Sequence, residues 1–181
     1  EKLNVSRYIF TYIPAGSVET EGGSERMLNQ FIRACAETKP DLKFNSYTAE
    51  DEDLKGILRG FSEGKIDLLF AMKMLDEGVD VPRAEVGIFC SSSGNPRQFV
   101  QRRGRLLRKH PAKSFATIFD MVVIPRLSGG DMGNFTMEKN MVRTELQRVG
   151  YFASLSMNFY DSKEALEEVC SKYDLSLDQI I

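Results

Sequence analysis

Short apolar runs that alternate with amphipathic stretches constrain the fold of this chain more than any other feature. The runs IDLLFA (66–71), VGIFC (86–90) and FATIF (115–119) are almost free of polar residues, as expected for strands covered on both faces. Strands of this kind that are separated by helices imply β-α-β crossovers. The sequence therefore predicts an α/β fold with a doubly wound parallel sheet flanked by helices.

The same patterns predict the remaining elements of the first part of the chain. We expect a strand over 7–13, a helix capped by Ser24 and stopped by Pro40, a strand over 44–47 and a helix over 50–61. The polar segment 18–24 is expected to be a loop.

Beyond Pro125 the pattern changes from strands to helices. A Gly-rich segment, 127–134, precedes two helical stretches at about 135–158 and 161–173. We therefore expect a sheet domain over 1–128 and a helical C-terminal extension over 129–181. The apolar stripe of the last helix is expected to pack locally, with a partner-binding role left open; it consists of Leu166, Val169, Cys170 and Tyr173.

Composition excludes several classes of protein. The net charge of −2 and the pI near 5.6 argue against a chain that coats nucleic acid with its whole surface, so any anion site is expected to be local. No apolar run approaches the roughly 18 residues that span a bilayer. No secretory signal is visible, and we expect a soluble, cytoplasmic protein without a membrane partner. The chain starts at Glu1, which suggests a piece of a longer protein.

Cysteine and histidine give no sign of a metal site. The 3 cysteines are far apart in apolar surroundings, which is typical of reduced core thiols. His110 is the single histidine, and nothing near it has the spacing of a metal ligand set. No metal ligand is predicted in this chain.

Positive charge is concentrated in the segment NPRQFVQRRGRLLRKH (95–110), which contains no acid. Gln101, Arg105 and Arg108 lie at i, i+4 and i+7, on one face of a helix that continues through Gly104. Two guanidiniums on one face can bind a polyphosphate, because each donates a fork of hydrogen bonds. A row of surface charges or salt bridges is the alternative interpretation.

The loop MKMLDEGVDVP (72–82) follows a predicted strand. Its Gly78-Val79-Asp80 turn allows a close backbone approach to a ligand, and Asp80 can accept a hydrogen bond from a hydroxyl group. In open α/β sheets ligands bind at the carboxyl ends of the strands. We expect this loop, the segment 91–99 and the arginine helix to gather there.

These segments, in this order, resemble the second RecA-like lobe of superfamily 2 helicases and translocases of the DEAD/DEAH type. LLFAMKMLDEGVDVP looks like motif V, QRRGRLLR looks like motif VI with its Q-x-x-G-R-x-x-R pattern, and RYIFTYIPAG occupies the place of the strand leading to motif IV. The pattern is most similar to XPB-like repair helicases and to the motor subunits of type I and III restriction enzymes. The resemblance covers about residues 5–125 and implies a RecA-like fold.

The resemblance also implies roles for individual residues. Arg105 and Arg108 match the motif VI arginines that reach ATP phosphates across an interlobe cleft, with Arg108 as the arginine finger. Gln101 matches a position that orders the cleft. Gly78 and Asp80 match motif V residues that couple nucleotide to nucleic acid, Asp80 by reaching the ribose or the motif VI arginines.

Further basic residues near the cleft are expected to contact the phosphate backbone of nucleic acid or to remain surface charges. They are Lys73, Arg97, Arg102, Arg103, Lys109 and Lys113. Many relatives have a hydroxyl residue six positions before the motif V glycine, where this chain has Met72.

No G-x-x-x-x-G-K-[ST] loop and no D-E-x-[DH] box occurs in the sequence. In the family these motifs lie on the N-terminal RecA-like lobe, which the resemblance makes the intrachain partner and the source of the Mg²⁺ ligands. The implied function is half of an ATP-dependent helicase motor acting on nucleic acid, with double-stranded DNA preferred. The fragment alone is not expected to hydrolyse ATP.

Two other hypotheses remain. The chain could be a non-catalytic nucleic-acid-binding module, although the intact Q-x-x-G-R-x-x-R pattern argues against lost catalysis. It could also be an unrelated α/β fold that uses the basic helix for a protein partner.

Overall fold

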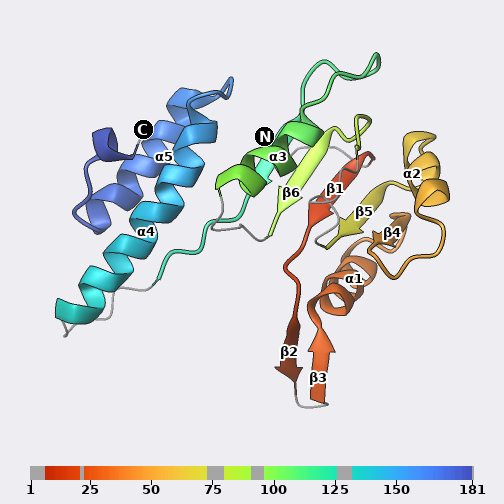
Figure 1. Cartoon of the computed structure of the whole chain (residues 1–181), viewed down its shortest axis with the longest axis horizontal. Helices are drawn as coiled ribbons and strands as arrows, with labels where there is room; N and C mark the ends of the chain where they lie inside the picture. The colour runs from red at the N-terminus through yellow and green to blue at the C-terminus, as the bar shows by residue number, and fades with distance from the viewer. Residues whose placement is uncertain (1–6, 21–22, 73–79, 91–95, 126–131, 181) are drawn as a thin grey trace. The chain divides into compact units, whose positions relative to one another are not determined.

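A computed structural model of the chain describes residues 7–20, 23–72, 80–90, 96–125 and 132–180; the side chains at 24, 96–99, 132–134 and 179 lie outside this description. The chain consists of two compact units, residues 1–121 and 122–181 (Figure 1). The domain boundary that we expected at 128/129 falls within 126–131, outside the described residues.

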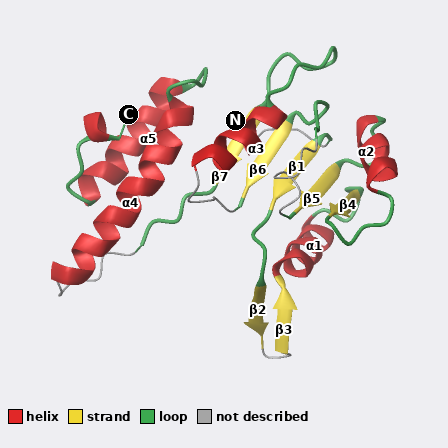
Figure 2. Ribbon diagram, in the orientation of Figure 1, coloured by secondary structure: helices red, strands yellow, loops and turns green. Residues whose placement is uncertain are grey.

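A parallel sheet forms the centre of the first unit (Figure 2). Its described strands have the order β4-β5-β1-β6-β7, and every neighbouring pair is parallel. They are β4 (Phe44–Tyr47), β5 (Leu68–Ala71), β1 (Ile9–Tyr12), β6 (Val86–Phe89) and β7 (Thr117–Asp120). Tyr12 pairs with Phe89, and Phe89 pairs with Asp120, so the last residues of β1, β6 and β7 lie side by side. The predicted parallel α/β fold is confirmed.

Helices cover both faces of this sheet. Helix α1 (Met27–Thr38) packs on the face that carries Ile9, Leu68 and Val86. Helices α2 (Leu54–Ser62) and α3 (Pro96–Leu106) pack on the opposite face, where Phe10, Tyr12, Leu69 and Phe89 are buried. Successive residues of a strand point to opposite faces, so continuously apolar strands such as β1 and β5 fill both layers.

The segment that we expected to be a loop forms a hairpin instead. Strand β2 (Ser17–Thr20) pairs antiparallel with β3 (Gly23–Arg26), and the hairpin extends away from the five-stranded sheet (Figure 1). The prediction that Ser24 caps α1 is therefore wrong, because Ser24 lies within β3 and Arg26 directly precedes the helix. Gly23 has a φ of 111°, a conformation that glycine adopts without strain. The segments 17–20 and 23–26 are separated by two residues, Glu21-Gly22, and this spacing is typical of a β-hairpin. The polar composition of the segment made it look like a loop.

The second unit is helical. It contains α4 (Met132–Ala153), α5 (Phe159–Lys172) and a 3₁₀ turn, η2 (Leu177–Gln179). Val142 and Leu146 of α4 form a core with Leu166, Cys170 and Tyr173. The expectation that the apolar stripe of the last helix packs locally is confirmed. Among the described residues no helix is long and apolar enough to cross a membrane.

Candidate phosphate-binding site

Helix α3 carries most of the basic segment and divides it between two environments. Arg102, Arg103 and Leu106 are buried, whereas Gln101 and Arg108 are exposed. The helix continues through Gly104 as predicted but ends at Leu106. The amide of Arg108 bonds to the carbonyl of Arg105 at 3.4 Å, a tighter turn than an α-helix makes. Arg108 therefore follows the helix instead of sharing its face with Gln101 and Arg105.

Arg108 forms an ion pair with Asp80. Its Nη1 lies 2.6 Å from Asp80 Oδ2, and the arginine side chain is 59% exposed. Arg108 and Asp80 are 28 residues apart in sequence. Their contact joins the segments that resemble motifs V and VI. The other carboxylate oxygen, Asp80 Oδ1, is buried and has no hydrogen-bond partner among the described residues. Asp80 thus offers an acceptor beside an accessible guanidinium.

Arg103 has the opposite environment. Its side chain is 1% exposed and its Nη2 donates to the carboxylate of Asp120 at the end of β7. The guanidinium carbon of Arg103 lies 4.3 Å from the centre of the Phe89 ring. An ion pair and an aromatic face together compensate a charge that water does not reach.

Arg102 is buried in the same layer. Its guanidinium carbon lies 4.3 Å from the centre of the Tyr12 ring. We expected Arg102 and Arg103 to contact nucleic acid or to be surface charges, but in this structure both residues are buried. The sequence contained a signal for this burial, because both residues precede the core residue Leu106 by three or four positions and share its side of the helix.

The middle of α3 and its C-terminal end contact different parts of the strands. Arg102 and Arg103 contact the last residues of β1, β6 and β7. Leu106 instead packs on Gly87, near the start of β6: a Cβ at Gly87 would lie 2.4 Å from Leu106 Cδ2. Arg108 follows this end of the helix. Of the expected gathering at the carboxyl ends of the strands, the structure describes the contacts of Arg102 and Arg103; residues 73–79 and 91–95 lie outside the described residues.

Lys113 holds the C-terminal end of α3. Its Nζ donates to the carbonyl of Leu106 at 2.7 Å and to the carbonyl of Ala84 at 3.0 Å. A lysine at this position satisfies a carbonyl that the helix leaves open. Burial lowers the pKa of Lys113. We had grouped Lys113 with the charges available to phosphate, and the structure gives it an internal contact.

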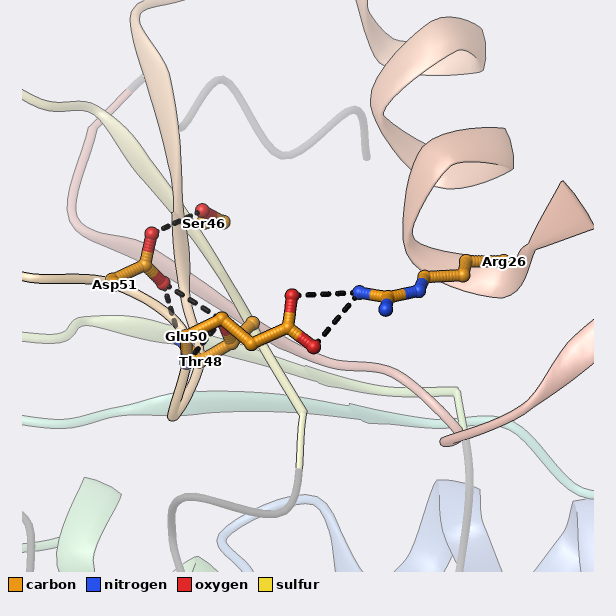
Figure 3. Close-up of polar contacts among 5 residues, drawn as sticks. All are labelled: Arg26, Ser46, Thr48, Glu50 and Asp51. Carbon is orange, nitrogen blue, oxygen red and sulfur yellow. Dashed lines mark hydrogen bonds and ion pairs between the residues drawn. The ribbon is translucent and has the colours of Figure 1, made fainter.

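The acidic segment 50–53 builds a turn between β4 and α2 (Figure 3). Asp51 accepts hydrogen bonds from the amide of Thr48 at 2.6 Å and from the hydroxyl of Ser46 at 3.0 Å. Glu50 pairs with Arg26 at 2.7 Å, and Asp53 caps α2 by accepting from the amide of Gly56. These contacts account for the acidic segment without a ligand.

The remaining predicted site residues are only partly described. Lys73 and Gly78, and the side chain of Arg97, lie outside the described residues. Gln101 is exposed, and Arg105 is half-buried with contacts to other residues. The predicted roles of all five in binding stay predictions.

A parallel sheet covered by helices on both faces, with an arginine helix over β6, defines a RecA-like lobe. Residues 22–110 match the family described as the helicase conserved C-terminal domain. The yeast DEAD-box splicing factor Prp28 has the same fold: its structure superposes with a TM-score of 0.54 over 96% of this chain and 32% of that chain, at 15% identity. Residues 22–110 thus carry a helicase C-terminal domain on a RecA-like fold.

Two curated relatives match part of this chain. The DNA 3'-5' translocase XPB2 of Sulfurisphaera tokodaii is 41% identical over 64 residues, which are 35% of this chain and 15% of the relative. A Dicer-like protein 2 of Phaeosphaeria nodorum is 37% identical over 65 residues, 36% of this chain and 5% of the relative. The matches therefore cover a small part of each relative, and they support the similarity to XPB-like proteins.

Proposed function

We propose that this chain is the second motor lobe of an ATP-dependent DNA helicase or translocase and that Arg108 is its arginine finger. The observation that carries the proposal is the Arg108–Asp80 contact, in which the motif V acid holds an exposed motif VI guanidinium at 2.6 Å. An exposed ion pair costs little to open. Arg108 can therefore leave Asp80 when a phosphate approaches. Its positive charge would then stabilise the negative charge on the phosphoryl group during transfer.

The residues around this pair fit a nucleotide. Arg108, just after the end of α3, would contact the phosphates, whereas Arg105 and Gln101 would act from the helix itself. The Asp80 carboxylate, which is partly exposed, could accept a hydrogen bond from a ribose hydroxyl. ATP would supply the phosphoryl group that is transferred to water. The Mg²⁺ ligands and the phosphate-binding loop belong to the N-terminal RecA-like lobe, the proposed intrachain partner. The separate chain is therefore expected to be inactive.

DNA is the proposed substrate. The archaeal relative is a DNA translocase by name, and its match to this chain is 41% identical. Lys73 and Arg97 are the proposed contacts to the phosphate backbone. Arg102 and Arg103 are left out of this set because they are buried.

The test is ATP hydrolysis by the full-length protein that contains this lobe, with double-stranded DNA, single-stranded DNA, RNA or no nucleic acid. Arg108→Ala should lower the stimulated kcat by about 10³-fold or more, the effect of losing an arginine finger. Arg26→Ala is the matched control, because Arg26 is 56% exposed and also pairs with a carboxylate at 2.7 Å. The control should retain wild-type turnover.

Two results would contradict the proposal. Wild-type turnover in Arg108→Ala would exclude the finger. A wild-type protein that binds DNA in a salt-dependent manner but hydrolyses no ATP with any nucleic acid would establish the alternative, a non-catalytic nucleic-acid-binding module.

A further inference from the structure

We propose that Arg103 and Asp120 are positioning residues that fix the rotation of α3 and so aim Arg105 and Arg108 at the nucleotide. The inference rests on the proposed function, because it concerns how the arginines of that site are held. Neither residue is proposed to touch the nucleotide. Arg103 is directed into the protein, where its guanidinium pairs with the carboxylate of Asp120.

The pair connects the middle of α3 to the sheet at one defined point. Asp120 is the last residue of β7, and Phe89, which lies under the Arg103 guanidinium, is the last residue of β6. Phe89 and Asp120 are register partners on neighbouring strands, so the Arg103 guanidinium can contact both residues at once. Arg102, over Tyr12 of β1, extends the contact to a third strand. Three neighbouring strands thus hold two successive residues of the helix.

Because the Arg103 guanidinium is buried, its pairing with Asp120 restricts the rotation of α3. The apolar contact between Leu106 and Gly87 sets how closely α3 approaches β6, but apolar packing tolerates small rotations. A buried guanidinium does not, because a rotation that separates it from the carboxylate leaves two charges in a medium of low polarity. Fixing register in this way is the best-attested use of buried ionic groups. The pair therefore selects one orientation of α3.

The orientation of α3 determines where the phosphate-facing side chains point. Arg105 lies two residues after Arg103, on a different side of the helix, and Arg108 follows the helix end. A side-chain group about 6 Å from the helix axis moves by about 1 Å when the helix rotates by about 10°. Misplacing a catalytic group by about 1 Å can lower a rate about 100-fold. Loosening α3 would therefore lower turnover without removing any group that contacts ATP.

The experiment replaces both charges in the full-length protein with apolar groups of similar size, as Arg103→Met/Asp120→Leu. Replacing a buried ion pair in this way often leaves stability unchanged, so Tm should stay near the wild-type value. We expect kcat for DNA-stimulated ATP hydrolysis to fall about 100-fold, whereas KM for ATP changes less than about threefold because the phosphate ligands remain. Arg148→Met/Glu145→Leu removes a pair whose arginine is also buried, 8% exposed, in the second unit, and it should keep wild-type kcat.

Wild-type kcat in the double variant at unchanged Tm would overturn the inference, because α3 would then be aimed without the pair. If the double variant fails to fold, Arg103→Lys serves instead: it keeps the charge but replaces the fork by a point donor, and kcat should fall about tenfold. Wild-type kcat in Arg103→Lys would overturn the inference equally. Arg108→Ala in the same assay separates the two proposals. If it is active, the proposed function fails; if it is inactive and the double variant is wild type, only the positioning role fails.

Discussion

Two arginine–aspartate pairs, whose arginines are five residues apart in sequence, have opposite physical character. Arg103 pairs with Asp120 in the interior, with 1% of its side chain exposed, whereas Arg108 pairs with Asp80 at the surface, with 59% exposed. Water screens the second pair and can replace either partner, but it does not reach the Arg103 guanidinium of the first, and Asp120 is only 15% exposed. The comparison teaches that the same chemistry holds a helix in place where it is buried and stays available to a ligand where it is exposed.

The largest expected effect on stability comes from removing one half of the buried pair. Arg103→Ala leaves the Asp120 carboxylate buried without its guanidinium and should lower the free energy of unfolding by about 3–5 kcal/mol. Urea unfolding of the chain, followed by circular dichroism, measures this change. A loss below about 1 kcal/mol would remove the contrast between the two pairs, because that is the range of exposed pairs.

An intermediate effect is expected at the C-terminal end of α3. Lys113→Met removes the donor to the carbonyls of Ala84 and Leu106 and should lower the free energy of unfolding by about 1–3 kcal/mol. Lys109→Met, at an exposed lysine of the same segment, is the control and should stay within about 0.5 kcal/mol of wild type. Equal effects of the two variants would show that Lys113 does not hold the helix end.

The smallest effect on stability is expected at the exposed pair. Arg108→Ala should change the free energy of unfolding by about 0–1 kcal/mol, and the difference from wild type should shrink further as salt is raised. The measurement is urea unfolding at low and high sodium chloride. A loss of about 3 kcal/mol would mean that Arg108 stabilises the fold, and a loss of turnover in this variant would then not identify a finger.

Much of the fold followed from local patterns. The apolar runs located β5, β6 and β7 to within two residues, because strands covered on both faces must be apolar along their length. The helical periodicity located α1 and α2 as well, although the predicted start of α2 at residue 50 was four residues too early. The hairpin of β2 and β3 was missed, since β2 is exposed along its length and no apolar alternation marks the segment.

The candidate site was predictable as a set of motifs but not as a set of contacts. The spacing of QRRGRLLR identified the arginines, and it suggested that Gln101, Arg105 and Arg108 share a helical face. The helix ends at Leu106, so this spacing does not hold for Arg108. The internal contacts of Arg102, Arg103 and Lys113 were also missed, because their partners Tyr12, Asp120 and Ala84 are distant in sequence.

The sequence by itself determined the parallel α/β class, the order of the motifs and the family they resemble, because periodicity and spacing are local properties of the chain. The partners and the exposure of each arginine were decided by the tertiary structure, which buries Arg103 beside Asp120 and leaves Arg108 exposed beside Asp80. Packing α3 on β6 places Leu106 against Gly87 and brings the ends of three strands beneath Arg102 and Arg103. The dielectric environment of each charge depends on this packing, and it is the environment that separates a structural arginine from one that can meet a ligand.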